Sequence, residues 1–171
     1  NPLYALARLP GMKVNQQGER FMDESLHFRD WGDAGNIQKQ VGIAYMILSQ
    51  RTIDQFRTSG VPGSASQTKM LQDPEFLPLF EKALTKENPH VFKAVSLAEL
   101  AGKIGIDVNA LQASVDRYNG LCQSGQDTDY GNKLLFPVNE GPYYAFKCET
   151  GIFSTFDGLE VTENAQVLDQ N

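Results

Sequence analysis

The residues with the most chemistry available to them lie in one short segment, between positions 20 and 31. There a histidine, an arginine, an aspartate and two aromatic residues follow one another without a break: His27, Phe28, Arg29, Asp30 and Trp31. Arg29 offers a planar fork of N–H donors, which binds a carboxylate through two parallel hydrogen bonds. Two interpretations stay open. Arg29 either binds the carboxylate of a small-molecule substrate, or it forms a surface ion pair with Asp30.

Other catalytic signatures are missing from the sequence, which contains no glycine-rich nucleotide-binding motif, no HExxH and no GxSxG. We expect His27 and His90 to be solvated loop residues, because neither has a second histidine or cysteine at ligand spacing, and we expect no metal site. Asp23 and Glu24 are adjacent and would point to opposite sides of an extended chain. We therefore expect them to cap or bridge locally rather than to act as an acid and base pair.

Composition excludes several classes of partner. The 171 residues carry a net charge of −6, and the 15 Lys and Arg residues are scattered singly, so no basic stripe is available to bind nucleic acid. The longest apolar run, Ile43–Leu48, is far shorter than the about 20 residues needed for a membrane span.

For Cys122 and Cys148 we expect two ordinary buried thiols, with a disulfide as the alternative.

The elements that position the segment of residues 20–31 follow from polarity and turn residues. The first half of the chain predicts a hairpin over 11–21, a helix over 33–40, a strand over 43–48, a helix capped at Thr52 with Gln55, and a loop over 58–67. The strand is apolar throughout, which is typical of a central position in a sheet. The arginine-containing segment therefore lies between the hairpin and the first helix.

The second half of the chain predicts a helix that begins near Asp73. Two helices joined by a tight turn follow it. Ser96 and Glu99 form a capping box, Gly105 ends the first of the pair, and Asp107 caps the second. The apolar face of the first helix carries Leu97, Leu100, Ala101 and Ile104, and that of the second carries Val108, Leu111, Val115 and Tyr118. We expect the faces to pack together through Leu100, Ile104, Leu111 and Val115. The remainder predicts a loop over 120–132, a strand over 142–146, and a hairpin of 159–161 with 166–168. The fold class is α+β.

Five motifs in one order resemble the fumarate reductase and succinate dehydrogenase flavoprotein superfamily. They are Val14-Asn15 with Gly18–Glu24; the helical pair of 97–107, 110–111 and 115–119; Asp127–Gly131; Pro142–Ala145; and Thr155–Leu159 with Val167–Asp169. The resemblance covers most of the chain. It implies an FAD-dependent oxidoreductase in which an α+β capping domain interrupts the flavin-binding domain.

The resemblance also implies a division of the chain and roles for its residues. Residues 1–15 would lead from the flavin domain, 16–140 would form the capping domain that gates a small-molecule substrate, and 141–171 would return to the flavin domain, the missing partner that holds FAD. The resemblance implies that Arg29 is catalytic and that Phe28 and Ser154 bind the substrate. It also implies that Thr155, Phe156 and Gly158 bind the cofactor.

Two segments depart from the family pattern. Phe28 stands four residues after Glu24, where the family places its arginine, so Arg29 fits with a one-residue slip; Ser154 and Asp157 replace the family's histidine and first glycine. A negative Asp157 would repel a dicarboxylate, so flavin-linked redox chemistry is expected and fumarate is not.

The alternative is a non-catalytic binding domain that retains the cap fold. We expect further sequence before Asn1, so cytoplasmic and exported locations both stay open.

Overall fold

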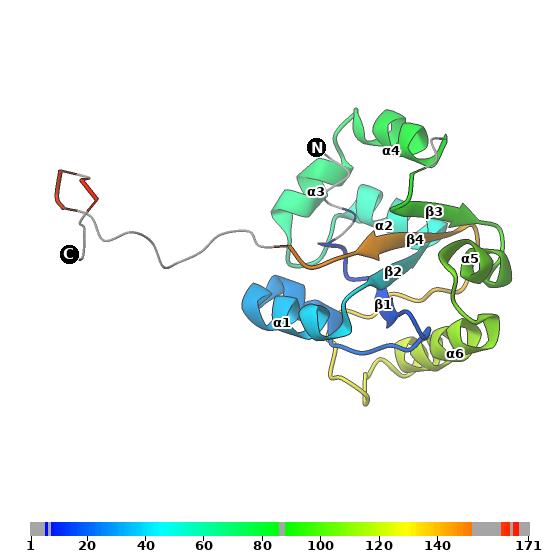
Figure 1. Ribbon diagram of the computed structural model, residues 1–171. Coiled ribbons are helices and arrows are strands. Elements are labelled where there is room, and N and C mark those ends of the chain that lie inside the picture. Colours follow the sequence, from blue (N-terminus) through cyan, green and yellow to red (C-terminus); the bar gives the residue numbers. More distant parts are fainter. Residues whose placement is uncertain (1–5, 7, 86–87, 152–161, 165, 168–171) are drawn as a thin grey trace.

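The computed structural model describes residues 6, 8–85, 88–151, 162–164 and 166–167. Its centre is a four-stranded antiparallel sheet in the order β1-β2-β4-β3 (Figure 1). The strands are β1 (Met12–Asn15), β2 (Ala44–Ser49), β3 (Val91–Ala94) and β4 (Tyr143–Cys148). Helices lie on both faces of the sheet, and the mixture confirms the α+β class. The sheet draws strands from all three segments of the expected division, which stays a prediction.

The strand β2 is central, as its apolar run predicts. It pairs with β1 on one side and β4 on the other, and all six of its residues are buried. Because side chains alternate along a strand, Tyr45 and Ile47 belong to one apolar core while Met46 and Leu48 belong to a second core on the opposite face. The sheet therefore separates two cores, each covered by its own helices.

The helices before β3 confirm several expectations and correct others. They are the 3-10 helix η2 (Glu24–Phe28), α1 (Trp31–Val41), α2 (Gln50–Ser59), α3 (Ala65–Leu71) and α4 (Phe76–Thr85). The predicted cap at Thr52 is wrong: Ser49 caps α2, its side chain accepting from the Thr52 N–H. The loop over 58–67 is also wrong at its end, since Ser64 caps α3. In both cases a serine hydroxyl at the N-cap position accepts from a free backbone N–H group in the first turn of the helix.

The pair α5 (Leu97–Ile104) and α6 (Val108–Ser124) forms as its capping signals predict. Ser96 accepts from the Glu99 N–H, and Gly105 adopts the left-handed conformation that ends α5. The helices pack their apolar faces into the core on the β1, β2 and β4 side, although Val108 is exposed. The loop predicted from Gly120 is wrong at its start, because α6 continues to Ser124 and ends at Gly125, which has a positive φ.

The first hairpin forms as expected, with a minimal return strand. The Asn15 N–H donates to the Glu19 carbonyl at 2.9 Å, and an isolated bridge joins Val14 to Arg20.

The predicted strand over 159–161 and the end of its partner lie outside the described residues, as do Ser154, Thr155, Phe156 and Gly158. No helix in the described ranges is long and apolar enough to cross a membrane.

Candidate active site

The segment between β1 and α1 is built around the 3-10 helix η2. Asp23 caps this helix: its Oδ1 accepts from the Ser25 N–H at 2.8 Å and from the Ser25 hydroxyl at 2.5 Å. At the other end, the N–H groups of Arg29 and Asp30 both donate to the Leu26 carbonyl, at 3.0 and 2.8 Å. The backbone that carries Arg29 is therefore held at both ends of the helix.

The side chain of Arg29 is paired with Asp23 and not with Asp30. Its Nη2 lies 2.5 Å from Asp23 Oδ2, and the arginine side chain is 58% exposed while that of the aspartate is 9% exposed. Asp30 instead caps α1, its Oδ1 accepting from the Asp33 N–H at 3.0 Å. The surface pair of Arg29 with Asp30 is thus wrong, because helix capping occupies that carboxylate. Phe28 is partly buried and packs against the core on the α2 side.

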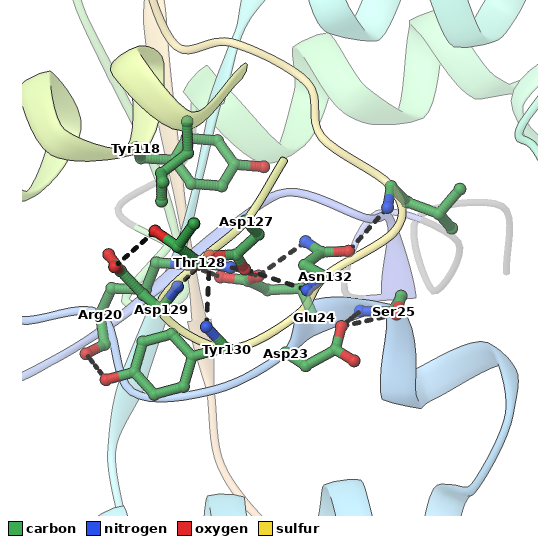
Figure 2. Close-up of polar contacts among 12 residues, drawn as sticks. Arg20, Asp23, Glu24, Ser25, Tyr118, Asp127, Thr128, Asp129, Tyr130 and Asn132 are labelled. Carbon is green, nitrogen blue, oxygen red and sulfur yellow. Dashed lines mark hydrogen bonds and ion pairs between the residues drawn. The ribbon is translucent and has the colours of Figure 1, made fainter. Parts of the chain in front are cut away.

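Directly after Asp23, Glu24 enters a buried ionic network (Figure 2). Arg20 reaches Glu24 with two nitrogens, Nε at 2.9 Å and Nη2 at 2.6 Å, and the same Nη2 lies 2.7 Å from Asp127 Oδ2. The side chain of Arg20 is 7% exposed, and both carboxylates are fully buried. The expectation that Asp23 and Glu24 cap and bridge locally is confirmed, but the contact with Asp127, 107 positions from Arg20, was not foreseen.

The loop of residues 127–132 completes the network from the other side. Asn132 donates its side-chain amide to Glu24 Oε2 at 2.9 Å, and its backbone N–H donates to Asp127 Oδ2 at 3.0 Å. Asp127 Oδ1 accepts from the N–H groups of Asp129 and Tyr130. Burial alone would raise the pKa of Asp127, but the bonds from Arg20 and these three amides hold it well below its ordinary value. Asp127 is therefore a permanently charged anchor.

Two tyrosines enclose the Arg20 guanidinium. Its carbon lies 4.9 Å from the Tyr118 ring centroid and 5.1 Å from that of Tyr130, distances typical of cation–π contacts. The Tyr130 hydroxyl also donates to the Arg20 carbonyl at 2.9 Å. The network therefore fixes both the side chain and the backbone of Arg20. Two of the five family motifs, Gly18–Glu24 and Asp127–Gly131, supply the ionic residues of this network. Nothing in either motif predicts that the two segments are in contact.

A second buried contact supports η2 from β1. Lys13 is 2% exposed, its Nζ contacts His27 Nε2, and its backbone N–H donates to Glu24 Oε1 at 3.0 Å. Burial, then the charges of Lys13 and Arg8, lowers the pKa of His27 to about 3. The expectation of a solvated His27 is wrong, because the helix packs this ring against the strand. His90 is exposed, as expected.

Metal sites and cysteine chemistry find no support in the described part of the chain. It contains no cluster of three or more potential metal ligands. Cys122 and Cys148 are free, partly buried thiols, as expected, and burial raises the pKa of Cys122 to about 11. Neither thiol has the depressed pKa of a reactive cysteine.

The described residues do not fit the pyrophosphate of a dinucleotide. Such sites use a glycine-rich turn between a strand and a helix in a parallel βαβ unit, whereas every strand pair here is antiparallel and Ser49-Gln50 joins β2 to α2. The three residues expected to contact the cofactor lie outside the described ranges.

Comparison with known proteins decides the family. A sequence model of the FAD binding domain matches residues 4–171. The chain belongs to this family. The resemblance to fumarate-reductase-like flavoproteins is confirmed, and FAD is supported as the cofactor of the parent protein.

Two curated relatives of this FAD binding domain chain are reductases. The vinyl phenol reductase of Lactiplantibacillus plantarum is 31% identical over 96% of this chain and 34% of its own length. The urocanate reductase of Eggerthella lenta is 30% identical over 92% of this chain and 23% of its own length. The chain thus spans about a third or less of these relatives.

Solved structures share the fold. The open conformation of a flavocytochrome c3 fumarate reductase aligns with a TM-score of 0.67 and 23% identity, over 97% of this chain and 26% of the other. A solution structure of the fumarate reductase flavoprotein subunit from Lactobacillus plantarum aligns with a TM-score of 0.54 and 25% identity, over 86% of this chain and 88% of that one.

Proposed function

We propose that this chain is the capping, substrate-gating part of an FAD-dependent oxidoreductase of fumarate-reductase type. Residues 1–15 and 141–171 would connect it to the flavin-binding domain, and residues 16–140 would form the cap. The family match over residues 4–171 supports this proposal. So do relatives named for the reduction of vinyl phenol and urocanate. The parent protein would act on a small organic substrate that gains or loses a hydride.

The flavin, held by the rest of the protein, would supply the hydride acceptor or donor. The chain described here would supply the closing surface and a fixed cation. Closure of a cap over a substrate expels water and strengthens the electrostatic contacts inside. The cap would thereby complete a site whose redox centre lies elsewhere.

The observation that carries the proposal is the geometry of Arg29. It is a half-exposed cation five residues after the family motif that ends at Glu24, and its backbone is held by η2. Its Nε and Nη1 have no hydrogen-bond partner among the described residues, which leaves donors for a ligand. Arginine keeps its proton at all ordinary pH values, so its role would be to orient and neutralise a substrate carboxylate or oxyanion.

The test uses the full-length protein that contains this chain. Purified protein should be yellow, and with a chemical reductant it should reduce a member of a panel of alkenes conjugated to a carboxylate or carbonyl. Arg29→Lys keeps the charge but loses the fork, so turnover should fall at least about tenfold while the flavin content is retained. Arg51→Lys, in an exposed pair with Glu140, is the matched control and should leave turnover unchanged.

The first of two results would overturn the whole proposal, and the second would overturn only the role of Arg29. A full-length protein that binds no flavin would favour the non-catalytic binding domain. Wild-type kcat and KM in Arg29→Lys would remove Arg29 from the site while leaving the oxidoreductase class in place.

A further inference from the structure

The carboxylate of Asp23 stands between the buried interior and the exposed Arg29. Its Oδ1 is occupied by the N–H and hydroxyl of Ser25, and its Oδ2 faces Arg29 Nη2. The Asp23 side chain is 9% exposed, so it has little freedom to follow a moving arginine. One oxygen thus fixes the aspartate to η2, and the other is left to fix Arg29.

The backbone position of Asp23 is set by its neighbour. Glu24 is completely buried and receives bonds from Arg20, from the Asn132 amide and from the Lys13 N–H. Asp23 and Glu24 are consecutive, so the network that immobilises Glu24 also immobilises the Cα from which the Asp23 carboxylate projects. Figure 2 shows the Asp23 and Ser25 contact beside the larger network.

This contact limits the orientations of the guanidinium. An exposed arginine otherwise samples many rotamers, so ordering its long side chain on binding a ligand has a large entropy cost. Nη2 carries two N–H groups, so a bond to Asp23 still leaves an edge of two donors for a carboxylate. The ordering cost is then met in the folded protein before any ligand binds.

We propose that Asp23 is a positioning residue for Arg29, which it holds in a single orientation toward the substrate. This inference rests on the proposed function for its catalytic consequence but not for its structural part. Asp23 itself touches no reacting atom. Its effect passes entirely through the orientation of the guanidinium.

The structural part is tested by side-chain NMR on the 171-residue chain. In Asp23→Asn the cap oxygen is kept but an amide NH₂ faces the arginine, so the Arg29 Nε–H group should lose its order, seen as a drop in its heteronuclear NOE. Asp129→Asn is the matched control, because Asp129 also pairs with an exposed arginine, Arg117, whose Nε lies at 3.0 Å and Nη2 at 2.5 Å from its two carboxylate oxygens. That variant should mobilise Arg117 and leave Arg29 unchanged. An equally ordered Arg29 in Asp23→Asn would overturn the proposal.

The catalytic part is tested by a double-mutant cycle in the full-length flavoprotein, measured in single turnovers so that slow variants remain readable. Asp23→Asn should lower kcat/KM by about 10- to 100-fold, yet add less than about twofold when Arg29 is already glutamine. A full, multiplicative loss in the Arg29→Gln background would overturn the positioning role. An Arg29→Gln variant with wild-type activity would instead defeat the catalytic role proposed for Arg29, while the NMR result would still decide whether Asp23 orders Arg29.

Discussion

Replacing Arg20 by glutamine should be among the most destabilising changes in the described part of the chain. The arginine is 7% exposed and is the shared counter-ion of Glu24 and Asp127, both fully buried. Removing one partner of a buried ion pair leaves an uncompensated charge and costs about 3 to 5 kcal/mol. For a chain of 171 residues, that corresponds to a fall in Tm of about 6 to 20 °C.

The pH dependence of this loss has a definite sign. In the wild type the pKa of Asp127 is depressed below 3.8, so its stabilisation is fully present above pH 3.8 and is lost as pH falls through the folded pKa. Without Arg20 the three amide bonds to Asp127 remain but the cation is gone, so the pKa of this buried carboxyl rises relative to the wild type. The carboxyl is then protonated at a higher pH in the variant than in the wild type, so the stability gap between the two should narrow as pH falls.

Urea denaturation followed by circular dichroism, at pH 7.5 and at pH 4.5, measures this gap. The control is Arg117→Gln, whose arginine is 61% exposed and pairs with Asp129; it should leave the unfolding midpoint nearly unchanged. A loss below about 1 kcal/mol in Arg20→Gln, or a gap that stays constant with pH, would refute the reasoning that Arg20 neutralises a buried pair.

Leu111→Ala should lower the free energy of unfolding by about 2 to 5 kcal/mol, because Leu111 is fully buried between α5 and α6; an unchanged Tm beside the exposed control Gln112→Ala would show that the packing is misassigned. The low pKa of His27, about 3 against 6.5, means that its stabilisation is present above pH 6.5 and lost as pH falls toward 3. His27→Gln should flatten the curve of unfolding free energy against pH between about pH 3 and 6.5. A curve of unaltered shape would contradict the lowered pKa of His27. The isolated chain should bind FAD weakly or not at all in a flavin fluorescence titration, since the described residues form no pyrophosphate turn; a stoichiometric yellow chain would refute this.

Local elements could be predicted from the sequence wherever the deciding groups are close together in the chain. Ser96 with Glu99, Gly105 and Asp107 specify the starts and end of α5 and α6, because capping satisfies backbone groups within about one turn. The continuous apolar run of β2 predicted its central place in the sheet. Where two hydroxyls compete for a helix start, as Ser49 and Thr52 do, the pattern predicted the wrong one.

The sequence by itself determined the family, through five ordered motifs, and the helices and strands at those motifs that the structure describes. Only the tertiary structure decided which charges meet. Arg29 pairs with Asp23 rather than its neighbour Asp30, and Arg20 reaches Asp127 across 107 positions. Local patterns encode backbone preferences over a few residues, whereas the partner of a charge depends on how distant segments pack. Burial then decides how much that partnership contributes, because a charge removed from water is stable only beside its counter-ion.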